Sequence, residues 1–442
     1  MNTLTAHITP PLSADRAQTI VQSLDLRALP RDFLDNPYPV YAVLRETEPF
    51  KRMPDGSFFL TRHADLVAVY RDAKVFSSDK QVEFGPKYNH PPFNQPPFAT
   101  ASGVAPLFEH HTNSLVFNDP PLHTRVRRLI MGALTRRAIE AMEPGLVHLV
   151  DSLLDKIEAQ GGGDLIEDFA SAIPVEIIGN LLGVPHAERE PLRGWSLAIL
   201  GALEPALTPE QEALGNRSVT EFLTFLRDLV ADRRQHPGDP EHDVLTRLIQ
   251  GEASGDTLSE VELLQNCVFL LNAGHETTTN LIGNALISLQ EWPEQRMRLL
   301  SDLHLAEDEH AQARVLDLAV DEFLRFESSN QLGNRRALQA TQVNGFDLPA
   351  GSLVTLCIGA ANRDPAVYEN PEQLDLRRTG NKHLAFGFGV HQCAGLSLAR
   401  LEGRIAIGRF LQRFPDYLLS QAPVRGGRAR FRGFLHAPFS IR

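Results

Sequence analysis

The sequence has few cysteines, no excess of positive charge and no long apolar run. Only three cysteines occur in 442 residues, which argues against a disulfide framework and excludes a four-cysteine iron–sulfur centre. The net charge of -12 argues against nucleic acid as the main partner. No run of eighteen apolar residues and no signal-type N-terminus is present. We therefore expect a cytoplasmic protein that does not engage a membrane.

Helical periodicity dominates what is present. It runs from 118 to 248, with breaks at 161–163, 183–185 and 205–209, and again from 257 to 289. A hairpin turned by Pro54-Asp55-Gly56 is expected over 51–62, so the predicted class is mainly α with a small β region. Residues 1–30 are expected to form a loosely ordered lead-in, and 80–117 a long loop. That loop would be either a substrate cover or a plain surface segment.

The most informative stretch is 386–395, which reads FGFGVHQCAG and runs into a predicted helix. Its cysteine, Cys393, sits where a loop meets a helix N-terminus, a position that lowers the pKa of a thiol and favours the thiolate. A thiolate is a nucleophile or a metal ligand. Phe386 and Phe388 supply an apolar wall, and His391 is a possible donor to an acidic group. This composition suits a flat, apolar, metal-bearing cofactor better than a hydrolytic substrate.

The stretch resembles the haem-ligand loop of the cytochromes P-450, whose pattern F-G-x-G-x-H/R-x-C-x-G it matches without a gap. The resemblance implies haem b, with Cys393 as the ligand to iron and with Phe386, Gly387 and His391 against the cofactor. The alternative is a buried, inert cysteine beside a glycine turn. Cys267 and Cys357 lie in apolar runs and are predicted to be small core residues.

The long helix predicted over 257–289 contains Ala273-Gly274-His275-Glu276-Thr277-Thr278, with Ser259 and Glu262 in capping-box spacing. Glycine inside a helix suggests a close approach by another group. The segment resembles the family's A/G-G-x-D/E-T signature, which implies that Glu276 and Thr277 relay protons. Ala273 would contact the haem, and Phe269, Asn272 and Ala273 are candidates to line the substrate pocket. A buried Asn272 could equally bond to a neighbouring helix.

Four further residues are candidates to hold the haem propionates. His123 and Arg127 lie four apart after Asp119-Pro120-Pro121 and resemble the family's H-x-x-x-R helix, although a solvated basic surface is the plainer interpretation. By resemblance, Arg335 matches the second propionate arginine, and His383 is a further candidate. The neighbouring Arg125 and Arg128 are expected to form part of a basic docking face for an acidic electron donor.

A charged network is also expected to hold the cysteine loop. Glu322 and Arg325 lie three apart on a predicted helix and resemble the family's E-x-x-R pair, with Arg378 as the partner. Ser328-Ser329 stands where many relatives carry proline, which leaves the path of the next segment open.

The resemblance extends in order from about Pro37 to Glu402 and implies a P-450 fold with the haem between the long central helix and the Cys-loop helix. It also implies a single domain over 1–442, which we expect to be a monomer. The implied reaction is a monooxygenation of a small organic substrate with O₂ and NAD(P)H-derived electrons. These electrons would come through a separate ferredoxin and ferredoxin reductase. The rival interpretations are a peroxygenase, which generally lacks the acid–threonine pair, and a haem sensor or carrier.

Overall fold

The computed structural model describes residues 9–240, 243–251 and 255–441, which form mainly α-helices and short strands. The predicted class, mainly α with a small β region, is confirmed. Internal contacts divide the chain into two compact units. Unit 1 comprises Met1–Val75, Pro144–Ile173 and Thr277–Arg442, and unit 2 comprises Phe76–Glu143 and Pro174–Glu276. The single-domain organisation stays a prediction.

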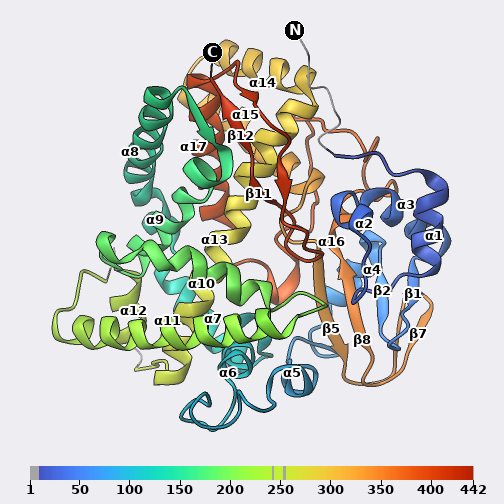
Figure 1. Cartoon of the computed structure of the whole chain (residues 1–442), viewed down its shortest axis with the longest axis vertical. Helices are drawn as coiled ribbons and strands as arrows, with labels where there is room; N and C mark the ends of the chain where they lie inside the picture. The colour runs from blue at the N-terminus through green and yellow to red at the C-terminus, as the bar shows by residue number, and fades with distance from the viewer. Residues whose placement is uncertain (1–8, 241–242, 252–254, 442) are drawn as a thin grey trace. The chain divides into compact units, whose positions relative to one another are not determined.

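One part of unit 1 combines N-terminal elements with residues 332–361 in a sheet flanked by helices (Figure 1). The predicted hairpin is confirmed as antiparallel β1 (Phe50–Arg52) and β2 (Phe58–Leu60). Strand β8 (Leu353–Cys357) runs parallel to β2, and β5 (Leu332–Ala337) pairs antiparallel with β8. The helices of this part are α1 (Ala14–Gln22), α2 (Arg31–Asp35), α3 (Tyr38–Thr47), α4 (His63–Arg71) and α16 (Ile358–Ala361). Ile20, Tyr41 and Phe59 are among the residues of one apolar core formed by these elements.

The rest of unit 1 is helical at its centre, with small sheets. Helix α15 (Glu309–Phe326) packs against α17 (Leu396–Arg413) and against α14 (Pro293–Leu305). Strand β12 (Pro438–Ser440) pairs with β4 (Gly162–Asp164) and β9 (Leu418–Leu419). The remaining elements are η2 (Leu165–Ala170), β6 (Thr341–Val343), β7 (Phe346–Leu348), η4 (Gly389–His391), β10 (Val424–Arg425) and β11 (Phe434–His436).

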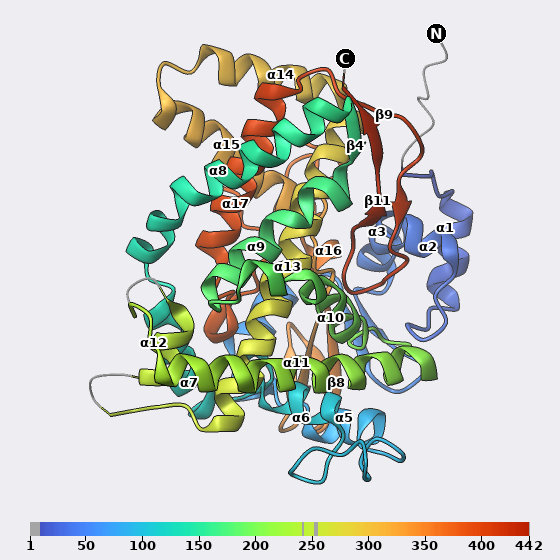
Figure 2. The ribbon, with the colours of Figure 1, turned by 60° about the vertical axis from the view of Figure 1, so that its left-hand side comes forward.

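Unit 2 is helical, and its longest helix, α11 (Pro209–Gln235), packs against α10 (Glu190–Gly201) and α6 (Pro106–Asn113), as Figure 2 shows. A capping box at Thr208 and Gln211 starts α11. The other elements are β3 (Phe76–Ser77), α5 (Gln81–Tyr88), η1 (Leu115–Phe117), α7 (Leu122–Ala133), η3 (His186–Glu188) and α12 (Val244–Gln250).

Three helices cross the boundaries between the units along the chain: α8 (Arg136–Gln160), α9 (Ala172–Leu181) and α13 (Glu260–Glu291). Helix α13 is the predicted long helix. Its predicted capping box is confirmed, because Ser259 N–H donates to Glu262 Oε2 at 2.8 Å and Glu262 N–H donates to Ser259 Oγ at 3.3 Å. Within the residues that the structure describes, no helix is both long enough and apolar enough to cross a membrane.

Two expectations about irregular segments differ from the structure. Within the expected lead-in over 1–30, helix α1 is ordered and buries Ala17, Ile20 and Val21 in the core. The expected loop over 80–117 holds α5, α6 and η1, so only its centre is irregular. The loop prediction was wrong because helix formation here depends on packing: Tyr88 is buried in α5, and its hydroxyl donates to Ala202 O at 2.5 Å.

Candidate active site

The loop around Cys393 is shaped by two glycines and closed by its own backbone. Gly387 and Gly389 have φ of +64° and +73°, in the left-handed region that favours glycine. A Cβ on Gly389 would lie 2.5 Å from the carbonyl oxygen of Tyr70, so only glycine fits there. Cys393 N–H donates to Phe386 O at 2.8 Å, which holds the cysteine close to the start of the loop. The loop is therefore a preformed structure of unit 1.

Cys393 differs from the other two cysteines in burial. It is half-buried and lies just before α17, whose N-cap is Gly395. Cys267 and Cys357 are buried, and burial raises the pKa of each thiol to about 12. This confirms the prediction that those two are core residues. Of the three cysteines, only Cys393 is accessible at a helix N-terminus, where a thiolate is favoured.

The residues near Cys393 present an apolar, incompletely covered surface. Phe386, Phe388 and Ala394 are half-buried, and His391 lies at the end of η4. The guanidinium of Arg400 lies 4.9 Å from the Phe386 ring centre, which fixes that ring at its edge of the loop. This surface and its single sulfur ligand fit a haem, since a porphyrin supplies the other in-plane ligands itself. The described residues contain no group of three His, Cys, Asp or Glu side chains that could hold a bare metal ion.

Two candidate propionate ligands lie in unit 1. Arg335 is on β5, with its guanidinium 5.1 Å from the ring centre of Tyr70 and its Nη1 donating to Asn334 O at 2.7 Å. His383 has its Nε2 3.4 Å from Asp321 Oδ1. Burial acts to raise the pKa of Asp321, but hydrogen bonds from His383 and Arg400 outweigh it and the pKa is lowered. His383 is thus already oriented by a carboxylate.

The other two propionate candidates lie on α7 in unit 2. His123 is buried and Arg127 is half-buried, four residues apart on one face as predicted. The basic docking face expected at Arg125 and Arg128 stays a prediction, and both side chains pair with carboxylates of their own unit. Arg125 pairs with Glu262 and Asp256, and Arg128 pairs with Asp256 at 2.5 Å. These pairs tie α7 to the start of α13.

The central part of α13 has one open side. Ala273 is exposed and Phe269 and Thr277 are half-buried, spaced four residues apart, and we call these three residues the open stripe. Asn272, His275 and Glu276 are buried beside it. The four residues that were predicted to share one face, Phe269, Asn272, Ala273 and Glu276, thus differ in their exposure. Ala273 and Phe269 keep an accessible position, whereas Asn272 and Glu276 are covered.

Gly274 is explained by a protein neighbour. A Cβ at this position would lie 2.4 Å from Cδ1 of Ile178 on α9, so α13 and α9 approach each other closely here. The sequence predicted a close approach at this glycine and left its partner unnamed. Within unit 2, the structure identifies that partner as a side chain of the core.

Ser328 and Ser329, where the path of the chain was left open, both make side-chain hydrogen bonds. Ser329 Oγ donates to the backbone carbonyl of Thr277 at 2.8 Å, and Arg432 N–H donates to Ser329 O at 2.8 Å. Ser328 Oγ donates to Leu324 O at 2.8 Å. The segment after α15 is therefore tied to α13 at the residue that was predicted to carry the catalytic hydroxyl. No motif in the sequence indicated this contact.

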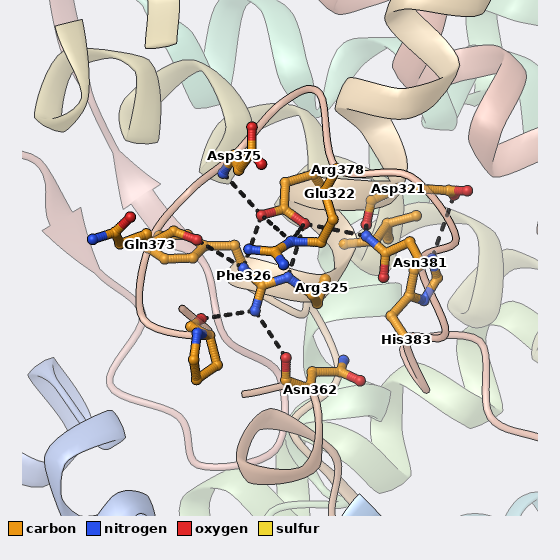
Figure 3. A network of polar contacts seen from close by, with 12 residues as sticks. Asp321, Glu322, Arg325, Phe326, Asn362, Gln373, Asp375, Arg378, Asn381 and His383 are labelled. Carbon is orange, nitrogen blue, oxygen red and sulfur yellow. Dashed lines mark hydrogen bonds and ion pairs between the residues drawn. The ribbon is translucent and has the colours of Figure 1, made fainter. Parts of the chain in front are cut away.

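The predicted network of Glu322, Arg325 and Arg378 is present and fully buried at its centre (Figure 3). Arg325 donates from Nε and Nη2 to the two oxygens of Glu322, each at 2.8 Å, and Arg378 Nε lies 3.1 Å from Glu322 Oε2. The remaining donors of Arg325 bind backbone carbonyls of Asn362, Pro371 and Gln373. A buried charge pair is stable only when its other hydrogen-bonding groups are satisfied, as they are here.

The network contains members that the sequence did not single out for it. Asn381 Nδ2 donates to Glu322 Oε2 at 3.2 Å, and Asp375 N–H donates to Glu322 Oε1 at 2.9 Å. Asn362 contributes its backbone oxygen to Arg325 and its Oδ1 to Leu384 N–H at 2.7 Å. Asn362 thereby links α15 to the segment that leads into the cysteine loop. Only spatial proximity, absent from a sequence, could have identified it.

Comparisons with known proteins agree with this architecture. The family model "Cytochrome P450" matches residues 202–422. Cytochrome P450 107B1 of Saccharopolyspora erythraea is 36% identical over 407 residues, covering 90% of this chain and 93% of the relative. The biotin biosynthesis cytochrome P450 of Bacillus subtilis is 33% identical over 411 residues, covering 90% of this chain and 95% of the relative.

A solved structure shares the fold across nearly the whole chain. It is that of P450BioI in complex with hexadec-9Z-enoic acid ligated acyl carrier protein, with a TM-score of 0.82 and 30% identity, covering 93% of this chain and 99% of that chain. Full-length similarity at this identity, a matching family model and a fitting cysteine loop lead to one conclusion. The chain belongs to the cytochrome P450 family and is a haem-binding P450 monooxygenase.

Proposed function

We propose that this protein inserts one oxygen atom of O₂ into a small-to-medium apolar organic substrate, with Cys393 as the ligand of its haem iron. The observation that carries the proposal is the preformed loop 386–395, which presents one thiol at a helix N-terminus within an apolar surface. When bound, the haem supplies the redox chemistry that activates O₂. The chain supplies the ligand, the fixed surroundings and the protons.

Cys393 would hold the iron, and the helix dipole of α17 together with backbone N–H groups would stabilise its negative charge. Phe386, Gly387 and Ala273 would contact the flat faces of the cofactor. The propionates would be held by the cationic and imidazole side chains that can bind carboxylates, namely His123, Arg127, Arg335, His383 and His391. The network of Glu322, Arg325 and Arg378 would hold the segment before the loop and would take no part in the chemistry.

Glu276 and Thr277 would handle the protons that O₂ reduction consumes. Glu276 is buried, and a carboxyl in such surroundings can take up and release a proton beside the reaction rather than in bulk water. Thr277 is half-buried on the open stripe, so its hydroxyl would pass that proton on toward the substrate side. The hydrogen bond from Ser329 to the Thr277 carbonyl would keep this turn of α13 in place.

The substrate class is supported by the apolar character of the open stripe, in which Phe269 and Ala273 are the accessible side chains. The similar structure that holds a hexadecenoic acid on acyl carrier protein agrees with an apolar substrate. The two electrons would come from NAD(P)H through a separate ferredoxin and its reductase. In unit 2, Arg125 and Arg128 pair with carboxylates, which reduces the positive charge that they would present to that donor.

The test is the Cys393→Ser variant. A serine hydroxyl does not give iron the electron-rich thiolate ligand, so we expect the red-shifted Soret band of the ferrous–CO complex to disappear and monooxygenation to be lost. Cys267→Ser is the matched control, and it should retain the band because Cys267 is a core residue. A red-shifted band that persists in Cys393→Ser would show that Cys393 is not the ligand of the iron.

A further inference from the structure

Four buried polar side chains form a continuous hydrogen-bonded chain in unit 2. Glu109 and His110 come from α6, and Gln265 and Asn272 come from α13. Gln265 Nε2 donates to Glu109 Oε2 at 3.0 Å, His110 Nδ1 lies 3.1 Å from Gln265 Oε1, and Asn272 Nδ2 lies 3.3 Å from His110 Nε2. Each residue is less than one-tenth exposed. A buried polar network of this kind is costly wherever one of its members lacks a hydrogen-bond partner.

The direction of the donors along this chain is determined at its Glu109 end. A carboxylate only accepts hydrogen bonds, and the second oxygen of Glu109 accepts from Thr100 Oγ1 at 3.0 Å. The Gln265 amide therefore turns its NH₂ to Glu109 and its oxygen to His110. Burial lowers the pKa of His110 to about 4, so the ring is neutral, with a proton on Nδ1 and an acceptor at Nε2. That nitrogen accepts a hydrogen bond from Asn272 Nδ2.

This series of hydrogen-bonded side chains consequently ends at Asn272 Oδ1, an amide oxygen that can only accept hydrogen bonds. This oxygen is buried and has no hydrogen-bond partner among the described residues. Buried polar atoms nearly always have a partner, so an acceptor held in a fixed orientation needs an explanation. Asn272 precedes Ala273 of the open stripe and lies one helical turn before Glu276.

We propose that Asn272 Oδ1 accepts a hydrogen bond from a neutral hydroxyl or amide N–H of the substrate, which makes Asn272 a specificity-determining residue. The donor would be neutral, because the Asn272 amide oxygen and the neutral His110 ring behind it carry no charge that could balance a buried ammonium. The substrate is then an apolar molecule with one hydrogen-bond donor, positioned one turn of α13 from Glu276. This inference rests on the proposed function for the identity of the substrate pocket.

The experiment compares matched alcohols and methyl ethers, since the ether keeps the apolar body and loses only the donor. The probes are menthol, cyclododecanol and androsterone with their methyl ethers, and dissociation constants are measured by equilibrium dialysis on the haem-loaded protein. We expect wild type to bind at least one alcohol about fivefold to tenfold more tightly than its ether, the effect of one buried neutral hydrogen bond. In Asn272→Leu this ratio should fall to about one, while the ether binds as before.

The double variant His110→Phe/Asn272→Leu removes both side chains of the terminal hydrogen bond. It therefore leaves no buried imidazole without a partner, which could otherwise destabilise the fold. It should show the same loss of alcohol preference. An alcohol-to-ether ratio that is unchanged in both variants, or the lack of any alcohol preference in wild type, overturns the inference. Dialysis requires no turnover, so a protein that prefers alcohols but oxidises nothing would retain this inference and lose the proposed activity. A protein that oxidises substrate but shows no preference for alcohols would retain the proposed activity and lose this inference.

Discussion

Ser329 shows how a single hydroxyl can support a turn of a helix from outside. It is 5% exposed, and it is held on both sides, by Arg432 N–H on its carbonyl and by the Thr277 carbonyl on its hydroxyl. A helix carbonyl that accepts an additional hydrogen bond keeps its turn in one geometry. Because Thr277 is the proposed proton donor on this turn, the position of its side chain should depend on Ser329.

We expect Ser329→Ala to reduce the coupling of NADH oxidation to product, with hydrogen peroxide rising several-fold. One neutral hydrogen bond contributes on the order of 1 kcal/mol, which corresponds to about a fivefold change in a branching ratio. Thr277→Ala should leak more peroxide than Ser329→Ala, since it removes the hydroxyl itself. Ser328→Ala is the control, because the Ser328 hydroxyl donates to Leu324 O and accepts from Asn362 Nδ2 and makes no hydrogen bond to the described residues of α13. Equal peroxide yields in wild type and Ser329→Ala, measured per NADH consumed, would argue against this positioning role.

At the scale of elements, α15 carries Glu322 and Arg325, which bind the segment that precedes the cysteine loop (Figure 3). The neighbouring arginines Arg377 and Arg378 provide a comparison built into the chain. Arg378 reaches the buried Glu322, whereas Arg377 pairs with Asp302 near the surface. The same residue type thus forms a buried and an exposed ion pair at adjacent positions.

Arg378→Met should lower the free energy of unfolding by about 3 kcal/mol, because it leaves part of the buried Glu322 charge without a counter-charge. Arg377→Met should change it by less than about 1 kcal/mol, since exposed pairs contribute little. Urea unfolding of the haem-loaded protein, followed by tryptophan fluorescence, measures both. Similar losses for the two variants would contradict the structural role assigned to the network.

At the scale of the whole molecule, one buried carboxyl should make stability depend on pH. Glu402 on α17 is buried, and its Oε2 has no hydrogen-bond partner within the described part of the chain. Burial raises its pKa to about 8. The folded protein therefore holds a proton that the unfolded chain releases near its usual value of 4.5. Stability from this group is complete below that value and is lost as the pH rises through about 8.

Glu402→Gln should consequently raise the thermal midpoint at pH 8 and leave it nearly unchanged at pH 5. Between these pH values, the free energy of unfolding of wild type should fall relative to that of Glu402→Gln by roughly 1.4 kcal/mol per pH unit. The reason is that glutamine mimics the protonated carboxyl and does not titrate. The exposed Glu294 offers a matched control, and Glu294→Gln should show no such pH dependence. A difference between Glu402→Gln and wild type that is equal at both pH values would show that Glu402 is charged in the fold.

The sequence alone determined the features that depend on neighbours along the chain. The capping box of α13, the β1–β2 hairpin, the spacing of His123 and Arg127, and the glycines beside Cys393 all follow from local backbone chemistry. The pattern of the cysteine loop was specific enough to indicate the family before any contact was known.

Only the tertiary structure decided which distant groups meet. It showed that α5 and α6 are helices within 80–117, that Gly274 faces Ile178, and that Ser329 binds Thr277. It also showed that His110 orients Asn272, which one sequence cannot reveal because the two residues are 162 positions apart. Hydrogen bonds and close packing depend on distances between side chains, and these distances exist only once the chain has folded.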